Sequence, residues 1–226
     1  MAQTWRDLLF AHWPIAVEAL RPLVPAALEL DSFGGQAWIG VVPFRMTGIR
    51  ARWLPPVPWL SAFAELNVRT YVTVGGKEGV YFFSLDAPNP VAVATARRWF
   101  HLPYMNATMS CQPDGDAVVY SSRRTHRGAP AAELRARYRP RGPVALAGPG
   151  SLARWLTERY SLYTLDPTER VLRGEIHHAP WPLQPAKAEI ATNTMASAVG
   201  ITLPTEAPLL HFARRLDVVL WSLRPV

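Results

Sequence analysis

The sequence predicts a mainly β protein of the α+β class, in which antiparallel strands curl or close into a barrel and only a few short helices occur. Short runs rich in β-branched and aromatic residues recur along the chain. Glycine-rich turns separate several of them, as in Phe33-Gly34-Gly35 and Gly75-Gly76-Lys77. Few stretches show the helical spacing of apolar residues, so the strands must bury their apolar faces against one another.

Most of the chain is expected to form strands, each a run of alternating or continuous apolar residues between turn signals. The predicted strands cover residues 36–46, 64–72, 79–85, 104–111, 117–125, 134–139, 171–178 and 209–223. The strands 64–72 and 79–85 flank the Gly75-Gly76 turn and should form a hairpin. Residues 50–60, rich in Pro and Trp, are interpreted as a loop that either covers a pocket or stiffens a long connection.

Four short helices are predicted between these strands. They cover residues 15–24, 89–100, 151–160 and 186–199. Asn89 is suited to cap the second helix, because its side chain can accept hydrogen bonds from the first free backbone N–H groups, and Pro90 fits the first helical position. Ser151 is the corresponding cap of the third helix.

Length and composition bound the class of protein. With 226 residues and 49% hydrophobic content, the chain can bury a sizeable core, and we expect one domain over residues 1–226. The single cysteine, Cys111, excludes an internal disulfide framework and fits a reducing compartment. No leader pattern and no apolar run of membrane length are present, which predicts a cytoplasmic protein without membrane contact. Exposed edge strands are compatible with a homodimer.

The net charge of +7 is concentrated in an arginine-rich segment at residues 121–141. Residues 1–120 carry nine basic and nine acidic side chains, whereas residues 121–145 carry seven arginines and one glutamate. In residues 134–139 arginines alternate with Leu134, Ala136 and Tyr138, the pattern of a half-buried strand with a cationic outer face. Such a hairpin could bind an anion or nucleic acid, but no interleaved aromatic residues are available for base stacking, so a solvated edge strand is favoured.

The predicted strand 64–72 carries the most informative polar row. Because side chains alternate along a strand, Glu65, Asn67, Arg69 and Tyr71 share one face. The opposite face carries only Ala64, Leu66, Val68, Thr70 and Val72. A carboxylate, an amide, a guanidinium and a phenol in one row can bind a small polar molecule, and the same row could equally form the solvated outer face of a sheet.

Other chemical motifs are absent or weak. No nucleotide-binding, serine-hydrolase or metalloprotease motif is present. His177 and His178 point to opposite faces of a strand, and no other histidine spacing fits a metal, so we expect no metal site and no cofactor. Lys77 lies in a predicted turn and Lys187 at the start of a predicted helix; both are expected at the surface, and the distance of Lys187 from any cavity is open.

Several segments together resemble the YqjF-type family of uncharacterised conserved proteins. They are AWIGVVPFRM at 37–46, ELNVRTYV at 65–72, residues 80–86 with the helix that follows, LPY at 102–104, HAPWPL at 178–183 and HFARRLDVV at 211–219. The resemblance spans nearly the whole chain. It implies membership of the acetoacetate-decarboxylase-like superfamily, with a closed, mainly antiparallel barrel around a small-molecule cavity.

The resemblance also implies where the chemistry differs. Glu65 falls where acetoacetate decarboxylase carries a cavity-facing glutamate, which implies that the polar row faces inward. The decarboxylase then carries two consecutive lysines, the first of which forms a Schiff base with its keto acid. The corresponding stretch here reads Leu102-Pro103-Tyr104-Met105, so amine-based decarboxylation at this position is excluded.

Two classes of function follow from the residues and the resemblance. In the first, the cavity binds a small oxygenated molecule, resembling a keto or carboxylic acid, without turnover. In the second, Glu65 is a general acid or base of a lysine-independent lyase, isomerase or hydrolase acting on a small organic acid. In both, Arg69 would hold an anionic group, Asn67 and Tyr104 would orient the ligand, and Tyr71 would extend the polar wall.

Overall fold

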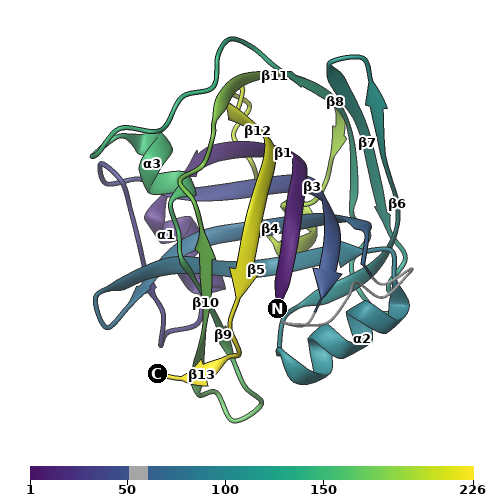
Figure 1. Ribbon diagram of the computed structural model, residues 1–226. Coiled ribbons are helices and arrows are strands. Elements are labelled where there is room, and N and C mark those ends of the chain that lie inside the picture. Colours follow the sequence, from purple (N-terminus) through teal and green to yellow (C-terminus); the bar gives the residue numbers. More distant parts are fainter. Residues whose placement is uncertain (51–60) are drawn as a thin grey trace.

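The computed structural model describes residues 1–50 and 61–226, and its main feature is one connected sheet of strands (Figure 1). The strands are β1 (Ala2–Ile15), β2 (Glu29–Leu30), β3 (Ala37–Arg50), β4 (Phe63–Val74), β5 (Lys77–Ala87), β6 (Tyr104–Asp114), β7 (Ala117–Arg124), β8 (Glu133–Pro140), β9 (Ser161–Leu165), β10 (Val171–His178), β11 (Gln184–Asn193), β12 (Leu209–Leu220) and β13 (Arg224–Pro225). The helices are α1 (Val17–Leu20), α2 (Pro90–Trp99) and α3 (Leu152–Thr157), with single 3₁₀ turns at Arg21–Leu23 and Ser197–Val199.

The strands close into two rings that share five members. The first ring runs β5-β6-β7-β8-β11-β12-β1-β3-β4 and returns to β5. The second closes through β9 and β10, because β9 pairs with β5 and β10 pairs with β12. Pairing is antiparallel except where β5 meets β6 and β9. The predicted mainly β fold with few short helices is therefore confirmed.

The shared strands β1, β3 and β4 lie between two hydrophobic cores and supply apolar side chains to both. In β1, Leu9 and Ala11 pack into one core and Leu8 and Phe10 into the other. In β4, the even-numbered residues from Ala64 to Val68 pack into the first core. The odd-numbered residues of β4 must then face the second core, so the polar row at residues 65–71 cannot be a solvated surface.

Helix α2 covers one side of the second ring (Figure 1). It begins as predicted: the Asn89 side chain accepts hydrogen bonds from the backbone N–H groups of Val91 and Ala92, and Pro90 occupies the first turn. Several predicted elements agree closely with the structure, among them α2, the β4–β5 hairpin, β7, β8 and β10.

The helix predicted at 186–199 is wrong. Residues Gln184–Asn193 form strand β11, which pairs with β8 and β12, and only a 3₁₀ turn at Ser197–Val199 follows. Ala186, Ala188 and Ile190 pack against the first core, while Lys187 and Glu189 are exposed. The alternation has period two, and strand pairing outweighs the helix propensity of alanine.

Besides β11, four strands were not predicted from the sequence: β1, β9 and the two-residue strands β2 and β13. Strand β1 supplies apolar side chains to both cores, so its sequence lacks the alternation that identifies a half-buried strand. The loop interpretation of residues 50–60 falls mainly on residues 51–60, which lie outside the described part of the chain; Arg50 itself ends β3. None of the described helices is long and apolar enough to span a membrane.

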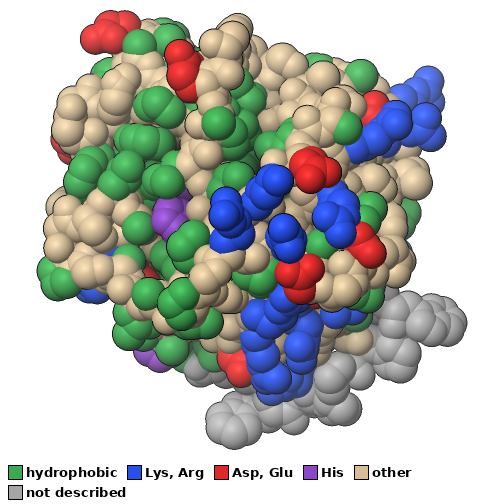
Figure 2. Space-filling model, turned by 90° about the horizontal axis from the view of Figure 1, so that it is seen from above, with side chains coloured by type: hydrophobic (Ala, Val, Ile, Leu, Met, Phe, Trp, Pro, Cys, Tyr) green, Lys and Arg blue, Asp and Glu red, His purple; other side chains and the backbone are tan. Residues whose placement is uncertain are grey.

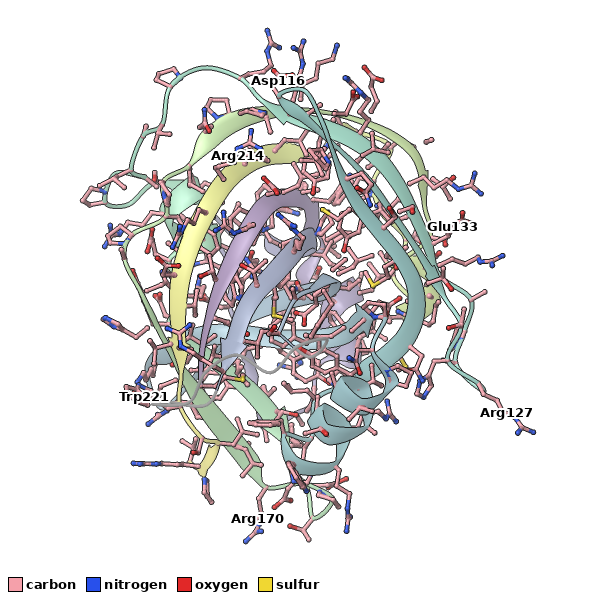
Figure 3. All side chains as sticks on the ribbon, turned by 45° about the vertical axis from the view of Figure 1, so that its right-hand side comes forward. Asp116, Arg127, Glu133, Arg170, Arg214 and Trp221 are labelled. Atoms are coloured by element: carbon pink, nitrogen blue, oxygen red, sulfur yellow. The ribbon has the colours of Figure 1, made fainter. Side chains whose placement is uncertain are left out.

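The arginine-rich segment forms β7, β8 and their connection. As predicted, Leu134, Ala136 and Tyr138 are buried and the intervening arginines are exposed. Acidic partners accompany many of these arginines: Arg135 pairs with Glu133, Arg137 with Asp114, Arg139 with Asp116 and Arg124 with Asp86. Basic and acidic side chains adjoin on the surface in Figure 2, and Arg127 points away from the molecule in Figure 3. This pairing weakens the argument for a nucleic-acid surface.

Candidate functional site

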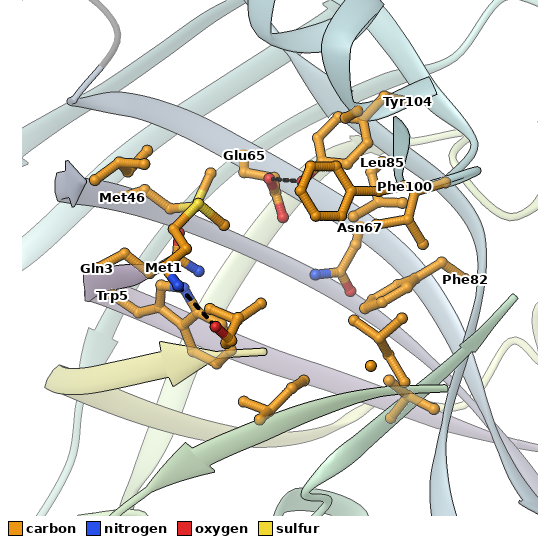
Figure 4. Close-up of a pocket in the computed structure, with 18 of the residues that line it drawn as sticks. Met1, Gln3, Trp5, Met46, Glu65, Asn67, Phe82, Leu85, Phe100 and Tyr104 are labelled. Atoms are coloured by element: carbon orange, nitrogen blue, oxygen red, sulfur yellow. Dashed lines mark hydrogen bonds between the residues drawn. The ribbon is translucent and has the colours of Figure 1, made fainter. Parts of the chain in front are cut away.

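A cavity of about 400 Å³ lies on the second-core side of the shared strands (Figure 4). Its walls come from β1, β3, β4 and β5 on one side, from β9, β10 and the end of β12 on the other, and from α2. Most lining side chains are apolar, among them Trp5, Phe44, Phe82, Leu85, Ile176 and Trp181. A mainly apolar cavity with a few polar groups is typical of a small-molecule site.

Strand β4 supplies three polar side chains of this wall. Glu65, Asn67 and Arg69 all line the cavity, and they are 4%, 4% and 8% exposed. They stay on one face although the register with β5 shifts between Val68 and Arg69. The predicted row is thus brought together in a buried wall rather than on the surface.

The Glu65 carboxyl group is held by Tyr104. The Tyr104 hydroxyl donates to Glu65 Oε2 at 2.6 Å, from β6 across to β4 (Figure 4). Burial raises the pKa of Glu65 to about 7, although the Tyr104 hydrogen bond acts in the opposite direction. Glu65 therefore exchanges a proton near neutral pH. Tyr104, which was also predicted to contact the ligand, comes from a different strand and lies next to Glu65.

Asn67 and Arg69 carry hydrogen-bonding atoms without a partner in the described structure. Asn67 Oδ1 and Arg69 Nε are buried and unpaired. The Arg69 guanidinium carbon lies 5.2 Å from the Phe10 ring centroid and 5.7 Å from that of Tyr71, and Nη2 makes one long contact of 3.4 Å with the Leu156 carbonyl oxygen. No carboxylate of residues 1–50 or 61–226 forms an ion pair with Arg69. The face of the cavity therefore carries a buried cation without a counter-ion.

Tyr71, the last predicted member of the row, lies beside the cavity rather than in its wall. Its hydroxyl lies 2.6 Å from Nε2 of the buried His12, and its ring packs against Trp155. Burial raises the pKa of Tyr71, and burial together with Arg69 lowers that of His12. The Tyr71 ring contacts the Arg69 guanidinium, but Tyr71 does not border the cavity.

The sequence did not reveal three further ionisable side chains of the wall: Arg159, Glu175 and His178. Arg159 follows α3, and the other two lie on β10, whose partners could not be known from local patterns. Arg159 Nη1 bonds Asp31 Oδ2 at 2.8 Å, and Lys77 Nζ bonds Glu175 Oε1 at 2.7 Å. Burial lowers the pKa of His178, which favours its neutral form.

Neither lysine of the chain borders the cavity. Lys77 pairs with Glu175 on the outside of the wall, and Lys187 is exposed on β11. The described residues contain no group of three His, Cys, Asp or Glu side chains that could hold a metal ion. The surface positions that were predicted for the two lysines agree with the structure.

Comparison with known proteins identifies the family. The model of the DUF2071 family, described as an uncharacterized conserved protein, matches residues 2–217. The chain belongs to the DUF2071 family. This DUF2071 chain is also 53% identical over 224 residues to the uncharacterized protein YqjF of Bacillus subtilis, covering 99% of the chain and 91% of the relative.

Solved structures show that the DUF2071 chain has an acetoacetate-decarboxylase-like fold. The acetoacetate decarboxylase of Legionella pneumophila matches with a TM-score of 0.65 at 13% identity, over 100% of this chain and 86% of that one. The enduracididine biosynthesis enzyme MppR complexed with pyruvate matches with a TM-score of 0.66 at 10% identity, over 99% and 89%. At these identities the likeness concerns the fold alone.

Proposed function

We propose that this protein binds a small oxygenated molecule, a keto or carboxylic acid, in the cavity beside β4 without forming a covalent bond to it. Arg69 binds the carboxylate, Asn67 donates its amide to a second oxygen, and Glu65 with Tyr104 contacts the remaining oxygen function. The observation that carries the proposal is the buried Arg69 guanidinium, which borders the cavity and has no carboxylate partner among the described residues.

A buried charge without a partner costs several kcal/mol in the folded state, so proteins generally pair it. Aromatic rings on Phe10 and Tyr71 offset part of this cost for Arg69. A bound carboxylate would offset more, because guanidinium–carboxylate hydrogen bonds are about twice as strong as neutral ones and are often bidentate. The fold-related MppR complex with pyruvate supports the same class of ligand.

The pKa of Glu65 and its hydrogen bond to Tyr104 favour a second candidate function, catalysis on the same class of acid. A carboxyl group with a pKa of about 7 can take and return a proton at neutral pH, and the Tyr104 hydroxyl can stabilise its charged form. In this version the protein is a lysine-independent lyase, isomerase or hydrolase. Turnover that survives Glu65→Gln unchanged would exclude this role.

Replacing Arg69 tests the binding proposal directly. Arg69→Met keeps an apolar stem of similar length and removes the charge, so the affinity for pyruvate or acetoacetate is expected to fall between about tenfold and a hundredfold. Isothermal titration calorimetry measures the change. Arg98→Met, at an exposed position of α2 outside the cavity, is the matched control and should bind normally. Unchanged affinity in Arg69→Met would contradict the proposal.

Borohydride trapping tests whether binding is non-covalent. Incubation with acetoacetate and borohydride is expected to leave both lysines unmodified, because neither Lys77 nor Lys187 borders the cavity. Intact-protein mass spectrometry is the readout, and acetoacetate decarboxylase treated in parallel is the positive control. An adduct mapped to either lysine would overturn this part of the proposal.

A further inference from the structure

The cavity is larger and more apolar than a short keto acid requires. Its volume of about 400 Å³ lies in the range, roughly 300–1,000 Å³, of sites that enclose drug-sized ligands. Pyruvate bound at Arg69 would leave most of this volume beside apolar side chains. The walls away from β4 carry Ile176, Leu220 and Leu223 on one side and Val91, Ala92 and Ala96 of α2 on the other.

Charged side chains of the wall leave one positive charge without compensation. The Arg159 guanidinium has Asp31 as its partner, and the Glu175 carboxylate has Lys77 and Arg173. His178 favours its neutral form because its burial lowers its pKa. Glu65 is neutral when protonated, and its pKa of about 7 makes this form common near neutral pH.

The Met1 ammonium group also lines the cavity and donates to the Leu220 carbonyl oxygen. Arg69 is then the one cationic side chain of the cavity wall in the described structure with no acidic partner. A ligand with one negative charge would neutralise it. A dicarboxylate or a phosphate ester would bring a second charge into an apolar cavity, which is costly without a second free cation.

We propose that the ligand is an amphipathic monocarboxylic acid, whose carboxylate binds Arg69 and whose extended apolar body fills the cavity toward α2 and the end of β12. This inference rests on the proposed function and adds the ligand's size and charge to it. The apolar wall continues to exposed side chains at its edge, since Val91 is 62% and Trp221 is 39% exposed. A long apolar body can therefore extend to the rim beside apolar side chains.

A series of 2-oxo acids of increasing length tests the inference. Calorimetric titration of the full chain at pH 6.5 with pyruvate, 2-oxopentanoate and 2-oxooctanoate is expected to show affinity rising about fourfold for each added methylene, which corresponds to about 0.8 kcal/mol. 2-Oxoglutarate, with its second carboxylate, is expected to bind more weakly than 2-oxopentanoate. Equal affinity for the three monoacids, or tighter binding of 2-oxoglutarate, would overturn the inference.

Variants of α2 locate the apolar body. Ala92→Leu and Ala96→Leu add side-chain volume to the cavity wall and are expected to weaken 2-oxooctanoate binding at least tenfold while changing pyruvate binding less than twofold. Leucine keeps the helix propensity high. Ala94→Leu, on the exposed side of the same helix, is the matched control and should bind both acids normally. Normal 2-oxooctanoate binding in both cavity variants would contradict the inference.

The result also separates this inference from the proposed function. If pyruvate and 2-oxooctanoate bind equally well and both lose affinity in Arg69→Met, the proposed function stands and the amphipathic ligand is wrong. If no acid of the series binds at up to millimolar concentration, both fail.

Discussion

Glu65→Gln is expected to stabilise the folded protein by about 3 kcal/mol at pH 8. Burial raises the pKa of Glu65 from 4.5 to about 7, so at pH 8 the folded protein must hold a carboxylate that burial disfavours. A shift of this size corresponds to roughly 3 kcal/mol at about 1.4 kcal/mol per pH unit. Glutamine has nearly the same shape and can still accept the Tyr104 hydrogen bond.

The sign of the pH dependence follows from proton binding. Between pH 4.5 and about 7 the folded state holds the Glu65 proton more tightly than the unfolded state does, so the free energy of unfolding falls as pH rises through this window. The penalty is absent below pH 4.5 and complete above about 7. The advantage of Glu65→Gln should therefore grow from near zero at pH 4.5 to its full value at pH 8.

Urea unfolding of both proteins at pH 4.5 and pH 8 measures this difference. Glu206→Gln, at an exposed position, is the control and should change the free energy little at either pH. A Glu65→Gln protein that is no more stable than the parent at pH 8 would show that Glu65 has an ordinary pKa, and it would remove the main support for a catalytic role.

Arg124→Met is expected to lower the free energy of unfolding by about 3–5 kcal/mol at pH 7, because it leaves the Asp86 carboxylate buried and unpaired. The Arg124 guanidinium donates from Nε and Nη2 to Asp86 Oδ1, the Nη2 bond being 2.8 Å long, and Nη2 also donates to Ser84. The side chains are 2% and 0% exposed. This pair joins β5 to β7, whose residues are distant in sequence.

Denaturant unfolding of Arg124→Met and of Asp86→Asn/Arg124→Met tests the pair. The double variant should recover much of the loss, because it removes the unpaired charge along with its partner. Arg137→Met is the matched control: its ion pair with Asp114 lies at the surface and should matter far less. A loss in Arg124→Met no larger than in Arg137→Met would show that Asp86 does not depend on Arg124.

Much of the fold could be predicted from local patterns where one face of a strand meets solvent or where a turn is distinctive. The alternating arginines of β8, the glycine turn of the β4–β5 hairpin and the Asn89 cap of α2 all predicted their elements. The sequence-based prediction was wrong for β11, where the alanines suggested a helix. It also failed to identify β1 as a strand. In both cases, pairing with strands far away in sequence decides the structure.

The sequence by itself determined that Glu65, Asn67 and Arg69 share a face, because the period of a strand is two. Only the tertiary structure decided that this face lines a cavity instead of meeting solvent. The reason is the closure of the second ring: β9, β10 and the neighbouring helix α2 form the opposite walls of the cavity and bury the row. That burial raises the pKa of Glu65 and leaves Arg69 without a counter-ion, neither of which a strand pattern can reveal.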